Sequence, residues 1–138
     1  MKNLLERDLA VHSAALNLQA YRQQLLASNI ANADTPNFKA RDLQFREALT
    51  AALGGRQGNG LPPLALAATH ARHLEGRSGT PADAFVLYRT EWQSAVDGNT
   101  VSMDAERAAF AENTVHYEAS ITFINGLLRT MQQAITGQ

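Results

Sequence analysis

A run of regularly spaced side chains in the C-terminal third of the chain restricts its possible folds more than any other feature. From Met103 to Ile135 the positions of the run alternate four and three residues apart. They are Met103, Arg107, Phe110, Thr114, Tyr117, Ile121, Ile124, Leu128, Met131 and Ile135. This is the spacing of a heptad repeat, in which one face of a helix packs against a partner helix. We therefore predict a long helix over residues 103–136, with Ser102 or Asp104 as its N-cap.

The N-terminal segment can supply the partner helix, because its apolar residues also recur three and four apart over residues 4–32. A second apolar row flanks the stripe in each segment, so a single partner would leave apolar side chains in water. The sequence predicts a mostly α fold with paired terminal helices that rely on neighbouring molecules to cover their outer flanks. The predicted assembly stripe comprises Leu18, Tyr21, Leu25, Phe110, Tyr117, Ile121, Ile124, Leu128, Met131 and Ile135.

The middle of the chain has weaker signals. A short helix is expected over residues 42–53, with Asp42 as N-cap and with Phe45 and Leu49 on one face. Glycine and proline punctuate residues 54–96, which indicates an irregular segment with at most short strands, in LALAAT and AFVLYR. We expect one structural domain built from residues 1–53 and 97–138, with a variable insertion between them.

Composition excludes several classes of function. The 138 residues carry a formal net charge of −1, so no broad positive field would attract nucleic acid or a membrane surface. The absence of cysteine excludes disulfides, thiolate metal sites and a cysteine nucleophile. Charged residues at positions 6–8 interrupt any N-terminal signal sequence, and no apolar stretch is long enough to span a membrane.

No pattern in the sequence points to catalysis. His70 and His73 are spaced i, i+3, whereas the helical zinc motif needs histidines at i and i+4. Asp104 and Glu106 are better explained by the positive end of a helix than by acid–base chemistry. We therefore predict no catalytic residue, no metal, no cofactor and no small-molecule substrate.

The segment from Leu26 to Arg41, LASNIANADTPNFKAR, is the other concentrated feature. Asn29 and Asn32 are one helical turn apart, so their amides can point the same way. Without further context the segment is a frayed helix end followed by a turn at Pro36. Its distinctive residues are Ser28, Asn29, Asn32, Asp34, Thr35, Pro36 and Phe38.

These residues resemble a known motif. ASNIANADTPNF is similar to the N-terminal motif of the flagellar basal-body rod and hook proteins, and residues 97–128 resemble the proximal rod members of that family. Ser102 departs from the acidic residue expected there, although serine also caps helices well. The two similar regions leave the middle of the chain uncharacteristic.

The resemblance implies a structural role without catalysis. It implies a subunit of the proximal rod that polymerises through its terminal helices, joins the membrane ring to the rest of the rod, and is needed for motility. The implied partners are copies of itself, other rod proteins, the ring–rod junction protein and the flagellar type III export gate. The implied location is the periplasmic rod of the basal body, reached from the cytoplasm without a cleaved signal peptide.

The resemblance also implies an export element of the form Phe-x-x-x-apolar, which Phe45 and Leu49 match. Taken alone, these two residues are simply i, i+4 partners on a short helix. Two other functions remain open at this point. One is a soluble helical adaptor or secretion chaperone, and the other is a small metal-dependent hydrolase using His70 and His73.

Overall fold

The computed structural model describes residues 2–54, 81–90 and 96–137. Helix α1 spans Lys2–Ala31, strand β1 Arg41–Leu43, helix α2 Phe45–Leu53, the 3-10 helix η1 Pro81–Phe85, strand β2 Val86–Tyr88, and helix α3 Met103–Thr136. The mostly helical fold with long terminal helices is confirmed. The expected strand in LALAAT, as well as His70 and His73, lies outside the described residues.

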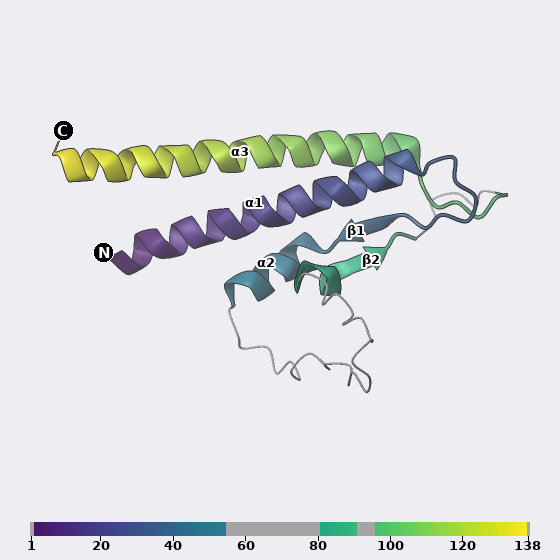
Figure 1. The fold of residues 1–138 in the computed structure, drawn as a ribbon, viewed down its shortest axis with the longest axis horizontal. Coiled ribbons are helices and arrows are strands. Elements are labelled where there is room, and N and C mark those ends of the chain that lie inside the picture. The colour runs from purple at the N-terminus through teal and green to yellow at the C-terminus, as the bar shows by residue number, and fades with distance from the viewer. Residues whose placement is uncertain (1, 55–80, 91–95, 138) are drawn as a thin grey trace, which may run out of the picture.

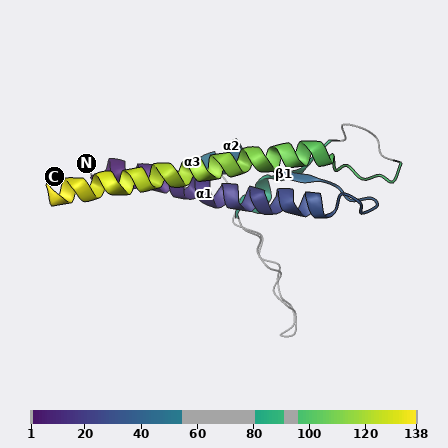
Figure 2. The ribbon, with the colours of Figure 1, turned by 90° about the horizontal axis from the view of Figure 1, so that it is seen from above.

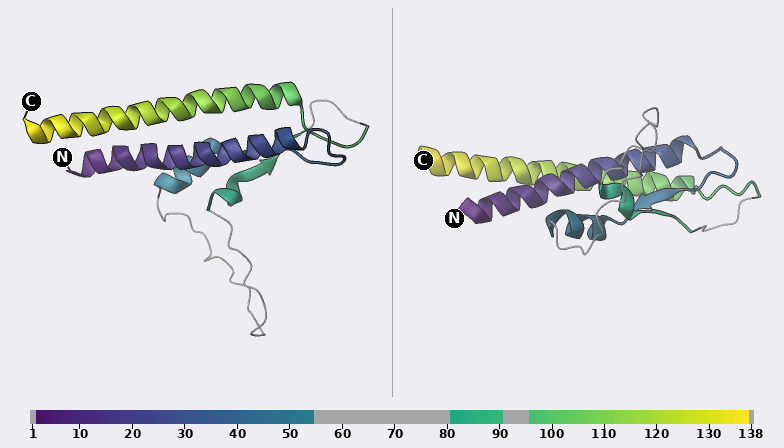
Figure 3. Two further views of the ribbon diagram at one scale, coloured as in Figure 1. Left: turned by 45° about the horizontal axis from the view of Figure 1, so that its top comes forward. Right: turned by 60° about the horizontal axis from the view of Figure 1, so that its bottom comes forward.

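The two long helices run antiparallel, side by side, and α1 is the central element (Figure 1). Helix α3 packs along one side of α1, while α2 and the β1–β2 pair pack on another side (Figures 1 and 2). Both chain ends lie at the same end of the helix pair (Figure 3). In the described part of the chain, neither long helix contains an apolar stretch that could cross a membrane.

The apolar core lies between α1 and the segment formed by α2, η1 and the β1–β2 pair, called here the α2–β arm. Its buried members are Leu18 and Leu25 of α1, Leu43 of β1 and Ala48 of α2. Partly buried side chains complete it, namely Tyr21, Phe45, Leu49, Ala82, Phe85 and Val86. The expected coiled-coil pairing of α1 with α3 is consistent with their contacts, yet the cluster of buried apolar residues lies on the other side of α1.

The start of the short helix differs from the sequence-based expectation. Asp42 is not an N-cap but pairs with Leu87 in the antiparallel strands β1 and β2, and α2 begins at Phe45 with Gln44 as its N-cap residue. The Gln44 amide donates to the Phe85 carbonyl oxygen at 2.9 Å, so strand pairing continues up to the helix. Pairing with a distant strand has overridden the local capping signal. In AFVLYR, only residues 86–88 form a strand.

Helix α3 begins at Met103 as predicted, with Ser102 as the N-cap residue. The Ser102 side chain makes no capping hydrogen bond, although its carbonyl oxygen accepts the first helical bond from the Glu106 amide at 2.9 Å. Serine therefore stands at the correct position without providing the expected side-chain cap.

Candidate functional site: a polar junction between the terminal segments

The two segments that carry the family resemblance lie against each other at the end of the helix pair. Asn99, which is 5% exposed, directs its Nδ2 to the carbonyl oxygens of residues 32, 33 and 35 at 3.1, 2.6 and 3.0 Å. Its Oδ1 accepts from the Val101 amide at 2.8 Å. The buried side-chain amide of Asn99 thus hydrogen-bonds the loop that follows α1 to the segment that precedes α3.

Further bonds continue this junction along the same two segments. The Asn37 amide donates to the Asp97 carbonyl oxygen at 2.9 Å, and the Thr100 amide donates to the Phe38 carbonyl oxygen at 3.1 Å. The Ala40 amide donates to Oγ1 of Thr100 at 2.8 Å. Residues 32–40 are therefore held to residues 97–100 by two backbone–backbone bonds and by the side chains of Asn99, Thr100 and Lys39.

The close approach requires a glycine at position 98. Gly98 has φ +71°, and a Cβ on it would lie 2.8 Å from Oδ1 of Asn37. Asn37 itself has φ 60°, a region that asparagine tolerates better than most residues. The glycine of the Asp97–Gly98–Asn99 sequence therefore permits the contact between the segments.

Asn29 links the end of α1 to both β1 and α3. It is 1% exposed, and its Nδ2 donates to the Arg41 carbonyl oxygen at 2.8 Å and to Oε2 of Glu106 at 3.0 Å. Its Oδ1 accepts from the Arg41 amide at 3.1 Å. The Asn29 side chain thus bonds both backbone groups of Arg41, as a neighbouring strand would. It also provides one of the hydrogen bonds that the buried Glu106 carboxylate needs.

Four charged residues form a closed cluster around this point. Arg22 donates from Nε and Nη2 to the two oxygens of Asp42 at 2.8 and 3.0 Å. Arg89 donates to Oδ2 of Asp42 at 2.6 Å and to Oε1 of Glu106 at 2.8 Å. Two positive and two negative groups thus balance, and they join α1, β1, the end of β2 and α3.

Glu106 is the most deeply buried charged group of the cluster, with 1% of its side chain exposed. Taking a carboxylate out of water is costly unless cations and donors replace the lost hydration. Arg89 and Asn29 occupy both of its oxygens. The burial of Glu106 therefore depends on Arg89, which directly follows β2.

Asp42 responds to the same surroundings. Burial by itself would raise the pKa of Asp42, but the hydrogen bonds from Arg22 and Arg89 outweigh this effect and hold the pKa below its ordinary value. The paired state thus persists to lower pH than for an isolated aspartate. Asp42 acts as a bridging anion between two arginines and not as a titrating acid near neutral pH.

The arrangement is suited to holding segments together. In the cluster the two guanidinium groups bind carboxylates of the chain itself, which leaves them poorly placed to bind an anionic ligand. Among the described residues no group of three or more histidine, aspartate or glutamate side chains could hold a metal ion.

The predicted rod-motif residues divide into two groups. Asn29 and Asn32 do not point the same way, because Nδ2 of Asn32 turns back to the Ser28 carbonyl oxygen at 2.8 Å. Oδ1 of Asn32 accepts from Thr35 at 3.2 Å. Asp34, Thr35 and Pro36 are exposed on the loop, while Phe38 is half-buried. The buried anchor is Asn29, and Asn32 shapes the turn.

Phe45 and Leu49 lie where their spacing places them, one turn apart on α2. Both are partly buried against the core formed by Leu18, Leu25 and Leu43. In the folded chain both side chains pack against the core. Another protein could therefore bind them fully only if α2 separated from the core.

The predicted assembly stripe is not one continuous surface. Leu18, Tyr21 and Leu25 face the α2–β arm, where Tyr21 also donates a hydrogen bond to Asp83. On α3, the half-buried members are Phe110, Ile124 and Met131, and the exposed members are Tyr117, Ile121, Leu128 and Ile135. The α1 part of the stripe is thus covered within the chain, whereas much of the α3 part remains accessible.

Sequence patterns missed most of the junction. Glu106 was interpreted as a helix-end charge, but it is buried and paired. Arg22 and Arg89 stood out in no motif, and Asn99 lay within the segment that resembled the family but had no predicted role of its own. Long-range pairing of charges has no local signature, so the cluster emerges only in three dimensions.

Comparison with known proteins identifies the family. A family model described as "Flagella basal body rod protein" matches residues 9–39. The flagellar basal body rod protein FlgB of Proteus mirabilis strain HI4320 is 43% identical over 136 residues, which cover 98% of both chains. FlgB of Escherichia coli strain K12 is 39% identical over 136 residues, covering 98% of this chain and 97% of the relative. FlgB of Cereibacter sphaeroides is 42% identical over 131 residues and 95% of each chain. Similarity that extends through the middle segment and both ends places the chain in the FlgB family of flagellar basal body rod proteins.

Proposed function

We propose that this chain is a structural subunit of the proximal rod of the bacterial flagellum. It polymerises through its terminal helices and connects the membrane ring with the rest of the rod, so flagellum-dependent motility requires it. Its partners are copies of itself, other rod proteins, the ring–rod junction protein and the export gate. The observation that carries this proposal is the nearly full-length similarity to FlgB proteins combined with an apolar row that α3 leaves accessible.

The accessible row gives the proposal a physical basis. Tyr117 and Ile121 are each 37% exposed, and Leu128 is 45% exposed. Beside Tyr117, α1 and α3 enclose an open groove of about 470 Å³ that is lined almost entirely by apolar atoms. Contiguous apolar surface of this kind is unfavourable in water and marks a contact with another molecule. A rod subunit surrounded by similar helices would cover it.

Leu128→Asp is expected to prevent incorporation into the rod while the purified chain keeps its helical content. A carboxylate in a subunit contact would lose its hydration without gaining a partner, and the cost recurs in every copy. In the single chain the side chain already reaches water, so folding should change little. Electron micrographs of basal bodies, swimming assays and circular dichroism would measure the two effects.

Thr122→Asp is the matched control, because Thr122 is exposed on α3 on the side opposite the buried face. It introduces the same charge on the same helix and should leave rods intact. Normal rods with Leu128→Asp would show that the row is not an assembly contact.

We further propose that the chain leaves the cytoplasm unfolded through the flagellar type III export gate, with Phe45 and Leu49 as a recognition element. Phe45→Ala should reduce secretion several-fold, because the gate would read this side chain on the unfolded segment. The amount of the protein in the medium of a strain that cannot retain rod subunits would measure the effect.

Leu25→Ala provides a control for damage to the folded core. Leu25 is 6% exposed and belongs to the same apolar cluster as Phe45. It should destabilise the folded chain at least as much as Phe45→Ala and yet leave secretion unchanged. Equal secretion of both variants would reduce Phe45 to a packing residue.

A further inference from the structure

The face that the N-terminal half of α3 turns towards α1 is mostly polar, whereas further along the helix the half-buried Ile124 and Met131 lie on the same face. The buried residues of α3 are Glu106, Ala109, Asn113 and Ser120, none of which is a large apolar residue. Opposite them, Gln19 and Asn29 are buried on α1. Large apolar side chains of α3, such as Phe123 at 64% and Leu128 at 45% exposure, are left nearer to water. Leu26, seven residues from Gln19 on α1, is also fully buried, but within the N-terminal half of α3 the burial of apolar surface alone would not select this orientation.

The apolar row lies beside this polar face. At 3.6 residues per turn, Phe110, Ile121 and Leu128 lie roughly 60° around the helix from Asn113. A rotation of α3 by that amount would turn the row towards α1 and carry Asn113 out to the edge. Such a rotation would also turn the half-buried Ile124 and Met131 away from α1, but in the N-terminal half of α3 an interaction other than apolar packing must hold the observed orientation.

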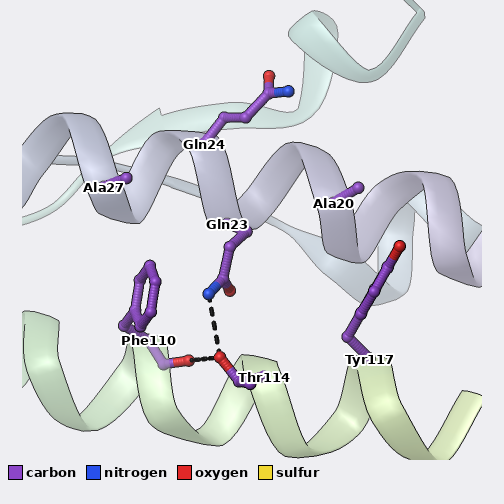
Figure 4. A pocket seen from close by; sticks show the side chains of 7 residues that line it. All are labelled: Ala20, Gln23, Gln24, Ala27, Phe110, Thr114 and Tyr117. Carbon is purple, nitrogen blue, oxygen red and sulfur yellow. Dashed lines mark hydrogen bonds between the residues drawn. The ribbon is translucent and has the colours of Figure 1, made fainter.

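Hydrogen bonds centred on Asn113 provide that interaction. Asn113 is 2% exposed, and its Nδ2 donates to the Gln19 carbonyl oxygen at 3.0 Å and also to Oε1 of Gln23. Nε2 of Gln23 donates in turn to Oγ1 of Thr114 at 3.0 Å (Figure 4). Gln23 thus points from α1 into the space between the helices, while Phe110 and Tyr117 flank it from α3 (Figure 4).

This polar contact has a cost that apolar packing would avoid. Among the described residues, Oε1 of Gln19 is buried without a hydrogen-bond partner. An unsatisfied buried oxygen destabilises a fold. Polar pairs within a helix interface are known to fix its alignment at some expense of stability.

We propose that Asn113, through Gln19 and Gln23, is a positioning residue that sets the rotation of α3 about its axis. It keeps the row of Phe110, Tyr117, Ile121 and Leu128 at the edge of the helix pair, where another molecule can reach it. The hydrogen bonds of Asn113 lie within one chain, so the proposed rotation of α3 does not depend on the proposed rod function. Only the assembly measurement below rests on that function.

The contact between His12 and Phe123 reports this rotation. Their rings stack with centroids 5.9 Å apart, and Phe123 lies on the side of Asn113 opposite to the apolar row. Turning the row towards α1 would move Phe123 away from His12. In the purified full-length chain, nuclear Overhauser contacts between the two rings should be present in the parent and lost in Asn113→Leu and in Asn113→Ala. The thermal midpoint of Asn113→Leu should be equal to that of the parent or higher, because apolar surface replaces the amide contacts.

Thr122→Leu is the matched control, since it places a leucine on the outer face of the same helix and should keep the ring contacts. Ring contacts that persist in both Asn113 variants would overturn the proposal. So would their absence from the parent, or a thermal midpoint for Asn113→Leu well below that of the parent, which would make Asn113 a simple contributor to stability. If the rings separate as expected but Asn113→Leu still enters rods normally, the rotation stands and the apolar row is not the rod contact.

Discussion

Replacing Arg89 by methionine is expected to lower the free energy of unfolding by about 3 kcal/mol, because it leaves a buried carboxylate without its cation. Glu106 has 1% of its side chain exposed and would retain only the amide of Asn29. Asp42 would still be paired with Arg22. Methionine keeps most of the apolar stem, so the loss reports the charge and its hydrogen bonds. Urea unfolding followed by circular dichroism would measure it.

The double variant Arg89→Met with Glu106→Gln tests the stated cause. A neutral amide no longer needs a cation, so the second substitution should recover a large part of the loss. Arg46→Met is the control, since Arg46 is exposed on α2 and its replacement should change stability by less than about 0.5 kcal/mol. A loss below 1 kcal/mol for Arg89→Met, or no recovery in the double variant, would contradict a buried-charge explanation.

Hydrophobic periodicity was sufficient to predict the two long helices. The repeat from Met103 to Ile135 gave the extent of α3, and the absence of proline and glycine over residues 4–32 gave α1 to within two residues. These signals are local, because each turn of a helix contacts the next turn of the same helix. The strand β1 has only three residues and exists because β2 pairs with it, so no periodic pattern could announce it.

The repeat predicted the pairing of α3 with α1 but not the polar residues within their contact. A heptad row suggested an apolar interface, but the residues buried on α3 include Glu106, Asn113 and Ser120. Polar residues at buried positions break the pattern by which such positions are recognised. The heptad row runs along the edge of the buried face. Its members Phe110, Ile124 and Met131 are half-buried, whereas Tyr117, Ile121, Leu128 and Ile135 are exposed.

The two resemblance motifs acquire a physical explanation from their contact. The ASNIANADTPNF segment ends α1 and the DGNT segment leads into α3, and Asn99 binds the first from within the second. The two termini are therefore connected by a fixed junction even though the middle of the chain lies between them. This connection fixes the end of α1 relative to the start of α3 within the single chain, as the proposed assembly through both helices would need.

Asn99→Asp is expected to destabilise the chain by about 3 kcal/mol, more than Asn99→Ala, although aspartate is nearly the same size as asparagine. The amide of Asn99 donates to three carbonyl oxygens in a site that is 5% exposed. A carboxylate cannot donate, so the oxygen that replaces Nδ2 would face carbonyl oxygens without water to separate them. Alanine only removes the donor, at a cost of about 2 kcal/mol. Urea unfolding of both variants, with amide exchange at Val101, would measure the order.

Asn17→Asp makes the same chemical change at an exposed position of α1 and should be almost neutral. The comparison separates the loss of the junction from any general effect of added negative charge on a chain whose net charge is already −1. Exchange at Val101 should accelerate in both Asn99 variants, because that amide loses its acceptor or the segment that holds it. If Asn99→Asp were no more destabilising than Asn99→Ala, the side chain would not be donating to the loop, and the junction would depend on its other hydrogen bonds alone.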